Sequence, residues 1–348
     1  MVCSLTLLIA PPANAQKRGS SSISSKLTQL VNQRSNIRVL SAFIEVVDTP
    51  SKSTVEILRD NKRQAIGTIV DADGLILTKA SQVNLVMLKG ELAPLVCKLA
   101  NNDRHEAKIV SINKEYDLAL LKIDVKRLDP IRFTLQEDPM VGAVLASTAL
   151  GDKPLGIGVM SAASRTIKQS RPMIGVQLKD IVDGARVESI VSGSAAKKAK
   201  LKIGDVIVKI DMKQIKDTQT LISTIKEYQP GDIIRLLVKR GEEQLELLCT
   251  LGEYSSGPNQ ARHEFQNHLG GKLSSRRSGF PMVFQHDTFL NPEDCGGPLV
   301  DLDGNAVGIN IARAGRVASY AIPAKVLPEL IAKLMLDAES SEVSTSSE

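Results

Sequence analysis

From about Thr54 onward, short apolar runs alternate with polar turns. Runs such as TVEIL, AIGTIVD, LILT, LVCKLA, AKIVSI and LALLKI are separated by DADG, NNDR and NKEYD, which favour tight turns. Several short strands at such close spacing predict an antiparallel barrel or sandwich. Nothing in this stretch has the alternation of strand and long helix that is typical of a parallel sheet. The expected fold is therefore mostly β.

A different pattern begins near Arg171. MIGVQL and ARVESIV predict strands, SAAKKAKL predicts a short helix that ends at the turn KIGD, and DVIVKIDMKQI predicts a pair of strands. TQTLISTIKEY places Leu221, Ile222 and Ile225 at helical spacing. A final hairpin is expected to turn at residues 240–242. These elements suit one small α+β domain.

The rest of the chain divides by composition. Residues 253–279 are rich in Ser, Gly, Asn, Gln and Arg, which predicts a linker or a long mobile loop. Strand patterns then resume, and VLPELIAKLMLDA predicts a terminal helix with one apolar face. The predicted order is a signal peptide (1–15), a linker or N-terminal segment (16–53), a first β-rich part (54–170), the small domain (171–252), the linker (253–279), a second β-rich part with its helix (280–336) and a disordered tail (337–348).

The N-terminal sequence MVCSLTLLIAPPANAQ indicates export. Its apolar run is too short to span a bilayer, and Ala13-Asn14-Ala15 is typical of a signal-peptide cleavage site. No Lys or Arg precedes Lys17, so the usual basic start of a signal is missing, which leaves open a true start further upstream or an ordinary frayed terminus. The expected location is periplasmic or extracellular. No later stretch is apolar enough to predict an integral membrane segment.

Charge and cysteine content narrow the function classes. The formal net charge of +5 is small for 348 residues and the Lys and Arg residues do not cluster, which argues against nucleic-acid binding. Outside the signal, Cys97, Cys249 and Cys295 allow at most one disulfide and lack metal-ligand spacing. No metal or other cofactor is expected.

Four segments carry a resemblance to a known family. They are AIGTIVDADGLILT (65–78), DLALLKI (117–123), QHDTFLNPEDCGGPLVDLDGNAVGIN (285–310) and SYAIPA (319–324). In this order they resemble the histidine, aspartate, nucleophile and closing segments of HtrA/Do-like serine proteases. The resemblance implies a trypsin-like double β-barrel formed by residues 54–170 and 280–336.

The catalytic positions implied by the resemblance are degenerate. Ser81 stands where the family has its histidine base, and a hydroxyl cannot accept a proton near neutral pH. Asp117 matches the aspartate that orients the histidine. Cys295 stands at the nucleophile position, and Glu293 replaces the glycine that, with the nucleophile, forms the oxyanion hole.

These departures predict a pseudoprotease. A thiol reacts as thiolate, and the acidic neighbours of Cys295 disfavour a second negative charge. No other histidine has an evident catalytic role, because His105 lies in a turn-to-strand segment, His263 and His268 in the linker, and His286 on the strand before the nucleophile loop. The alternative is an endopeptidase that uses Cys295.

Residues 173–178 (MIGVQL) and 193–208 (GSAAKKAKLKIGDVIV) resemble a bacterial PDZ domain, inserted between the aspartate and nucleophile segments. PDZ domains bind an extended peptide C-terminus by strand addition. The resemblance implies a peptide site and, with it, a role in protein quality control. A structural or assembly protein, in which these domains mediate homo-oligomer formation, is the other hypothesis. The residues of the implied peptide site are Arg171, Met173, Ile174, Gly175, Val176, Leu221 and Ile225.

Overall fold

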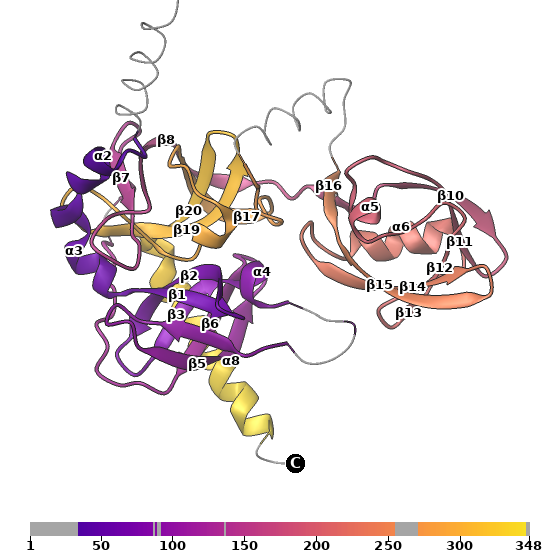
Figure 1. The fold of residues 1–348 in the computed structure, drawn as a ribbon, viewed down its shortest axis with the longest axis horizontal. Helices are drawn as coiled ribbons and strands as arrows, with labels where there is room; N and C mark the ends of the chain where they lie inside the picture. Colours follow the sequence, from indigo (N-terminus) through magenta and orange to yellow (C-terminus); the bar gives the residue numbers. More distant parts are fainter. Residues whose placement is uncertain (1–33, 86–87, 89–91, 136, 255–270, 346–348) are drawn as a thin grey trace, which may run out of the picture.

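Two closed six-stranded barrels lie side by side, and a third, separate domain projects from them (Figure 1). The computed structural model describes residues 34–85, 88, 92–135, 137–254 and 271–345. The predicted signal peptide lies outside this range. The prediction of a mostly β, double-barrel fold with an α+β domain is confirmed.

The first barrel contains the first two of the four motif segments, residues 65–78 and 117–123. Its strand order is β1-β2-β3-β6-β5-β4, and all neighbours are antiparallel. Its aliphatic core includes Ile57, Ile76 and Leu121. The strands are β1 (Thr54–Arg59), β2 (Lys62–Asp71), β3 (Leu75–Lys79), β4 (Leu95–Lys98), β5 (Arg104–Asn113) and β6 (Leu118–Ile123), with the short helix α4 (Ala80–Val83) after β3.

The second barrel is assembled from two distant parts of the chain. Strands β7 and β8 precede the inserted domain, and the other four follow it, in the order β17-β20-β19-β18-β7-β8. Pairing of β17 with β8 closes this barrel across the insertion. The strands are β7 (Val144–Ser147), β8 (Gly156–Ile167), β17 (Phe280–His286), β18 (Pro298–Val300), β19 (Ala306–Gly315) and β20 (Ala318–Pro323), with the 3-10 turns η1 (Pro292–Asp294) and η2 (Ala324–Val326).

The inserted domain has its own apolar core. Its sheet has the order β10-β11-β12-β14-β15, with β13 paired to β12, and helix α6 packs over it. A separate two-stranded ribbon of β9 and β16 joins the domain's two ends. The elements are β9 (Arg171–Met173), β10 (Val176–Ile181), β11 (Gly184–Ile190), α5 (Ala195–Lys198), β12 (Val206–Ile210), β13 (Lys213–Gln214), α6 (Thr218–Lys226), β14 (Ile233–Arg240), β15 (Glu243–Thr250) and β16 (Gly252–Tyr254).

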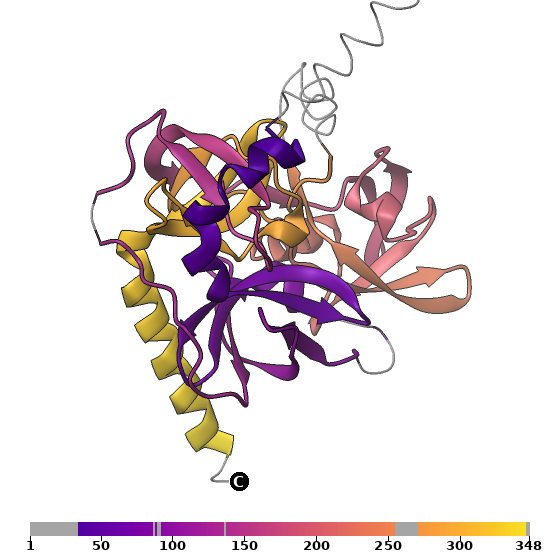
Figure 2. The ribbon, with the colours of Figure 1, turned by 60° about the vertical axis from the view of Figure 1, so that its left-hand side comes forward.

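Helices outside the barrels differ from the sequence prediction at both ends of the chain. Residues 37–52, expected to belong to a linker, form α2 (Ile37–Ser41) and α3 (Ile44–Lys52), and Val47 of α3 is fully buried against the second barrel. The C-terminal helix α8 (Leu327–Thr345) runs along the first barrel (Figure 2). It continues past residue 336, where a disordered tail was expected. Since no Gly or Pro follows Pro328 in this segment, nothing breaks the helix there.

Among the described residues, no helix is both long and apolar enough to cross a membrane.

Candidate functional site

The residues at the base and aspartate positions lie together where the first barrel faces the second. Ser81 is in α4, directly after β3, and Asp117 directly precedes the neighbouring strand β6. The Ser81 amide donates to Asp117 Oδ1 at 2.8 Å, and the Ser81 hydroxyl lies 2.9 Å from Oδ2. Asp117 is buried, with only 3% of its surface exposed. The carboxylate of Asp117 therefore binds Ser81, which stands where the resemblance places a histidine.

Lys79, the last residue of β3, is a site residue that sequence reasoning missed. It is fully buried, and its ammonium group forms an ion pair and a hydrogen bond with Asp117 Oδ2. A second hydrogen bond reaches the carbonyl oxygen of Arg276 at 3.3 Å. The sequence offered one signal for this site: a charged residue directly follows the apolar strand LILT. A lysine that is buried there requires an acidic partner.

Cys295 is fully buried next to these residues, close enough to Lys79 to feel its charge. The region between the two barrels that contains Lys79, Ser81, Asp117 and Cys295 is called the barrel cleft, or cleft, below. Burial raises the pKa of its thiol to about 11; the positive charge of Lys79 opposes this shift, and the negative charge of Asp294 adds to it. Gly296 brings this segment against β2, since a Cβ there would lie 2.1 Å from the carbonyl oxygen of Ile66. The thiol is thus protonated at neutral pH, which is the opposite of an activated nucleophile.

The backbone before Cys295 forms a closed turn. Residues 292–294 are the 3-10 turn η1, and the Cys295 amide donates to the carbonyl oxygen of Pro292 at 3.2 Å. Glu293 is half-buried in this turn, and its backbone does not adopt the left-handed conformation that favours glycine. Asp294 holds the turn in place by accepting from the Asn291 amide at 2.8 Å and from Arg63 at 2.5 Å. The nucleophile-position amide is therefore already used and does not point into an oxyanion hole.

Part of the expected linker enters this cleft. Residues 271–279 were predicted to be loop, but Ser274, Arg276 and Ser278 are buried. The Ser274 amide donates to the Arg313 carbonyl oxygen at 3.0 Å, and the Arg313 amide donates to the Ser274 hydroxyl at 2.9 Å. The polar composition of this segment predicted an exposed loop. Composition alone does not show that the backbone and hydroxyl groups of the segment form hydrogen bonds with β19.

Neither of the two histidines in the described part of the chain supplies a base to the cleft. His263 and His268 lie outside the described residues, and His105 is on β5, where it pairs with Cys97 of β4. His286 is fully buried on β17, with Nδ1 2.9 Å from the Thr288 hydroxyl. Burial lowers the pKa of His286 to about 4, and the charge of Asp287 only partly offsets this. His286 is therefore a neutral core residue at physiological pH.

This histidine makes the stability of the second barrel depend on pH. The unfolded chain binds a proton near pH 6.5 that the folded chain accepts only near pH 4, so stability is complete above about pH 6.5 and falls as the pH drops towards 4. The expected loss from this group is about 3 kcal/mol over that range. We expect His286→Gln to flatten this part of the pH profile of the unfolding free energy, measured by urea denaturation. His105→Gln is the matched control, and equal slopes in both variants would contradict this assignment.

A second candidate site is a groove on the inserted domain. The seven residues proposed from the sequence line one cavity of about 260 Å³, together with Pro172, Leu178, Ile222 and Lys226. The cavity lies between β10 and α6. In the described part of the chain, β10 pairs only with β11, so its other edge is open. An open strand edge beside an apolar helix face suits the addition of an extended peptide.

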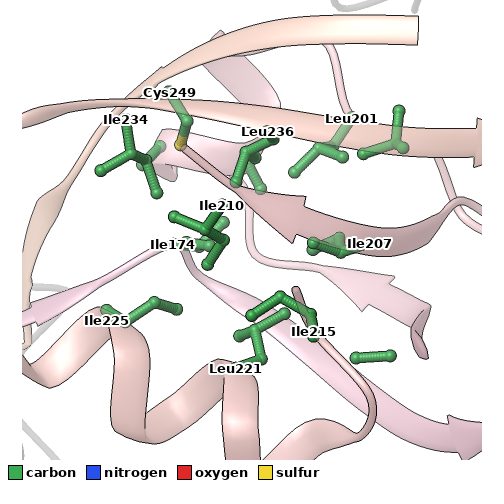
Figure 3. Close-up of a cluster of buried hydrophobic side chains, with 14 of the residues drawn as sticks. Ile174, Leu201, Ile207, Ile210, Ile215, Leu221, Ile225, Ile234, Leu236 and Cys249 are labelled. Carbon is green, nitrogen blue, oxygen red and sulfur yellow. The ribbon is translucent and has the colours of Figure 1, made fainter. Parts of the chain in front are cut away.

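The turn between β9 and β10 packs closely against Ser194. Gly175 has φ +83°, and a Cβ there would lie 2.4 Å from Ser194 Cβ, so only glycine fits. Neither the Ile174 nor the Gly175 amide donates a hydrogen bond to another described residue. The side chain of Ile174, however, points into the domain core beside Ile210 and Ile225 (Figure 3). Ile174 therefore holds the turn in place, whereas the half-buried Met173 and Val176 face the groove.

The three cysteines of the described residues are all free and buried. Cys97 lies in the first barrel's core and Cys249 in the core of the inserted domain. These separate locations explain why no pair forms a disulfide.

Comparison with known proteins identifies the inserted domain and finds relatives among the Do-like and HTRA1 proteases. A family model described as PDZ domain matches residues 172–251. Protease Do-like 8, chloroplastic, of Arabidopsis thaliana is 36% identical over 88 residues, which cover 22% of this chain and 20% of that protein. Serine protease HTRA1 of Xenopus laevis is 31% identical over 121 residues, 34% of this chain and 26% of that protein. The serine endoprotease from Yersinia pestis, a crystal structure, is 18% identical and covers 61% of this chain and 98% of that chain, with a TM-score of 0.29.

Two closed β-barrels joined to a PDZ domain define the class: a trypsin-fold protein with a PDZ insertion. Beyond the PDZ match, the chain is similar in sequence to HtrA/Do-like serine proteases. It spans less than a third of the length of the curated relatives that it matches.

Proposed function

We propose that this protein is a catalytically inactive HtrA-like protein of the cell envelope that binds protein C-termini in the groove of its PDZ domain. The open edge of β10, facing α6 across an apolar cavity, is the observation that carries the proposal. Export is inferred from the apolar run and the Ala13-Asn14-Ala15 sequence at the N-terminus. A role in protein quality control follows from capture of exposed chain ends.

Three features of the cleft support the lack of catalysis. Asp117 is paired with Lys79 and bound by Ser81, so it has no imidazole to orient. The thiol of Cys295 is buried and has a raised pKa. Its amide is bonded to Pro292 and is unavailable to stabilise an oxyanion. Nucleophile, base and oxyanion hole are thus each compromised independently.

The groove offers the chemistry that a free C-terminus needs. The unused amides at Ile174 and Gly175 can donate to a carboxylate, and the side chains of Arg171 and Lys226 add positive charge at the groove. Leu221 and Ile222 provide an apolar wall for the last side chain. Peptides that end in an aliphatic residue are therefore the expected ligands, with affinities around the micromolar range.

We expect Ile222→Asp to weaken binding of such peptides by about tenfold or more, because it places a carboxylate beside the bound carboxylate and removes apolar contact. Ile222 is 41% exposed, so the domain tolerates the change. Fluorescence polarisation with a labelled peptide library measures the effect. Amidation of the peptide C-terminus should weaken binding to the unaltered protein as well.

Val182→Asp is the matched control for this experiment. Val182 is 90% exposed in the turn after β10, outside the groove, so the same substitution there should leave affinity unchanged. Equal loss in both variants would show that charge alone, and not the groove, decides binding. A library of aliphatic-ended peptides without a single binder would favour the assembly hypothesis instead.

A further inference from the structure

Residues 274–278 lie in the barrel cleft like a strand with one buried side. Ser274, Arg276 and Ser278 are buried, whereas Ser275 is exposed and Arg277 half-buried. This alternation with a period of two is that of an extended chain on a surface. At its start, Ser274 exchanges hydrogen bonds with the backbone of Arg313 on β19. Ser274 also lies close enough to Cys295 to lower the pKa of its thiol. The segment therefore covers the nucleophile position directly.

Arg276 is the anchor of this segment. Its guanidinium donates to the carbonyl oxygens of Lys114 and Glu115, the latter at 2.8 Å, and lies 5.3 Å from the centre of the Phe280 ring. Its own carbonyl oxygen accepts from Lys79 at 3.3 Å. The turn that precedes Asp117 thus binds the guanidinium of Arg276, and Lys79 binds its backbone carbonyl oxygen.

The same segment contacts the PDZ domain on its other side. A Cβ at Gly231, in the turn between α6 and β14, would lie 2.9 Å from the carbonyl carbon of Ser275. The negative charge of Asp232, the next residue, acts on Arg276. Arg277 forms an ion pair with Glu253 of β16 at 2.7 Å. The segment is therefore held between the barrel cleft and the PDZ domain.

We propose that the barrel cleft is an internal peptide-binding site whose ligand is the chain's own segment 271–279, with Arg276 as the anchoring side chain. This bound segment fastens the PDZ domain to the barrels and closes the cleft to other peptides. The proposal does not depend on ligand binding in the PDZ groove, because every contact that carries it lies outside that groove.

The test compares Arg276→Ala with Lys272→Ala, an exposed residue of equal charge in the same segment. Alkylation by iodoacetamide is mapped by mass spectrometry on Cys97, Cys249 and Cys295. We expect Arg276→Ala to raise the labelling rate of Cys295 by about tenfold or more through local opening, with Cys97 and Cys249 unchanged. Lys272→Ala should label like the unaltered protein. A fluorescent peptide of residues 272–279, blocked at both ends so that it offers no free carboxylate to the PDZ groove, should bind the Arg276→Ala variant and not the unaltered chain.

Unchanged Cys295 labelling and no binding of the peptide by Arg276→Ala would overturn the proposal. If all three cysteines react, the variant has unfolded and does not test the proposal. Hydrogen exchange on the unaltered protein then provides the test. The Ser274 amide should then be protected together with β19. Exchange as fast as that of an exposed loop would overturn the proposal. Loss of PDZ ligand binding in the earlier experiment would leave these outcomes unaffected.

Discussion

Unfolded casein is expected to remain intact after prolonged incubation with the purified protein. Loss of the base alone removes about six orders of magnitude from a serine-protease-type rate, and here the nucleophile and the oxyanion hole are compromised as well. Gel electrophoresis and mass spectrometry of the casein measure the result. The expected rate equals that of buffer alone.

The Cys295→Ala variant is the matched control in that assay. Cleavage present in the unaltered protein and lost in Cys295→Ala would contradict the pseudoprotease proposal and favour the cysteine-dependent endopeptidase. Cleavage that persists in both proteins would point to a contaminating protease. Because Cys295 lies in the second barrel and not in the PDZ domain, its truncation should not alter the PDZ groove, and peptide binding serves as the folding control for that domain.

Lys79→Met is expected to destabilise the barrels by about 3–5 kcal/mol, because it leaves the buried carboxylate of Asp117 without its counter-charge. Lys79 has no exposed surface, and among the described residues Asp117 would keep only the hydrogen bonds from Ser81. Urea unfolding followed by circular dichroism measures the change in the barrel transition. The double variant Lys79→Met, Asp117→Leu should recover much of the loss, since it removes both charges.

Lys52→Met is the surface control. Lys52 pairs with Asp48 on α3, and both side chains are more than half exposed, so the expected cost is below about 1 kcal/mol. Similar losses for Lys79→Met and Lys52→Met would show that the buried pair contributes little. Such a result would also contradict the view that the ion pair with Lys79 stabilises the buried carboxylate of Asp117.

Part of the candidate site could be predicted from local sequence. Ser81, Asp117 and Cys295 were chosen because the motifs around them occur in the order of a known family, and the structure gathers all three near Lys79. The groove residues were found in the same way, since the turn with Gly175 and the spacing of Leu221 and Ile225 are local features. Ile174 shows the limit of predicting a site from resemblance. The resemblance assigns Ile174 to the peptide site, but only the packing of the structure shows that its side chain lies in the core.

The sequence by itself determined the strand-rich fold, the insertion of the PDZ domain and the presence of Ser81 where the resemblance places a histidine, because strand patterns, turn residues and residue identities are local. Tertiary structure alone decided that Lys79 pairs with Asp117 and that the Cys295 amide turns back to Pro292. It also decided that a segment with the composition of a linker is buried in the cleft. The physical reason is that burial and hydrogen-bond partners depend on residues far apart in the chain: Arg276 contacts a turn 161 residues away.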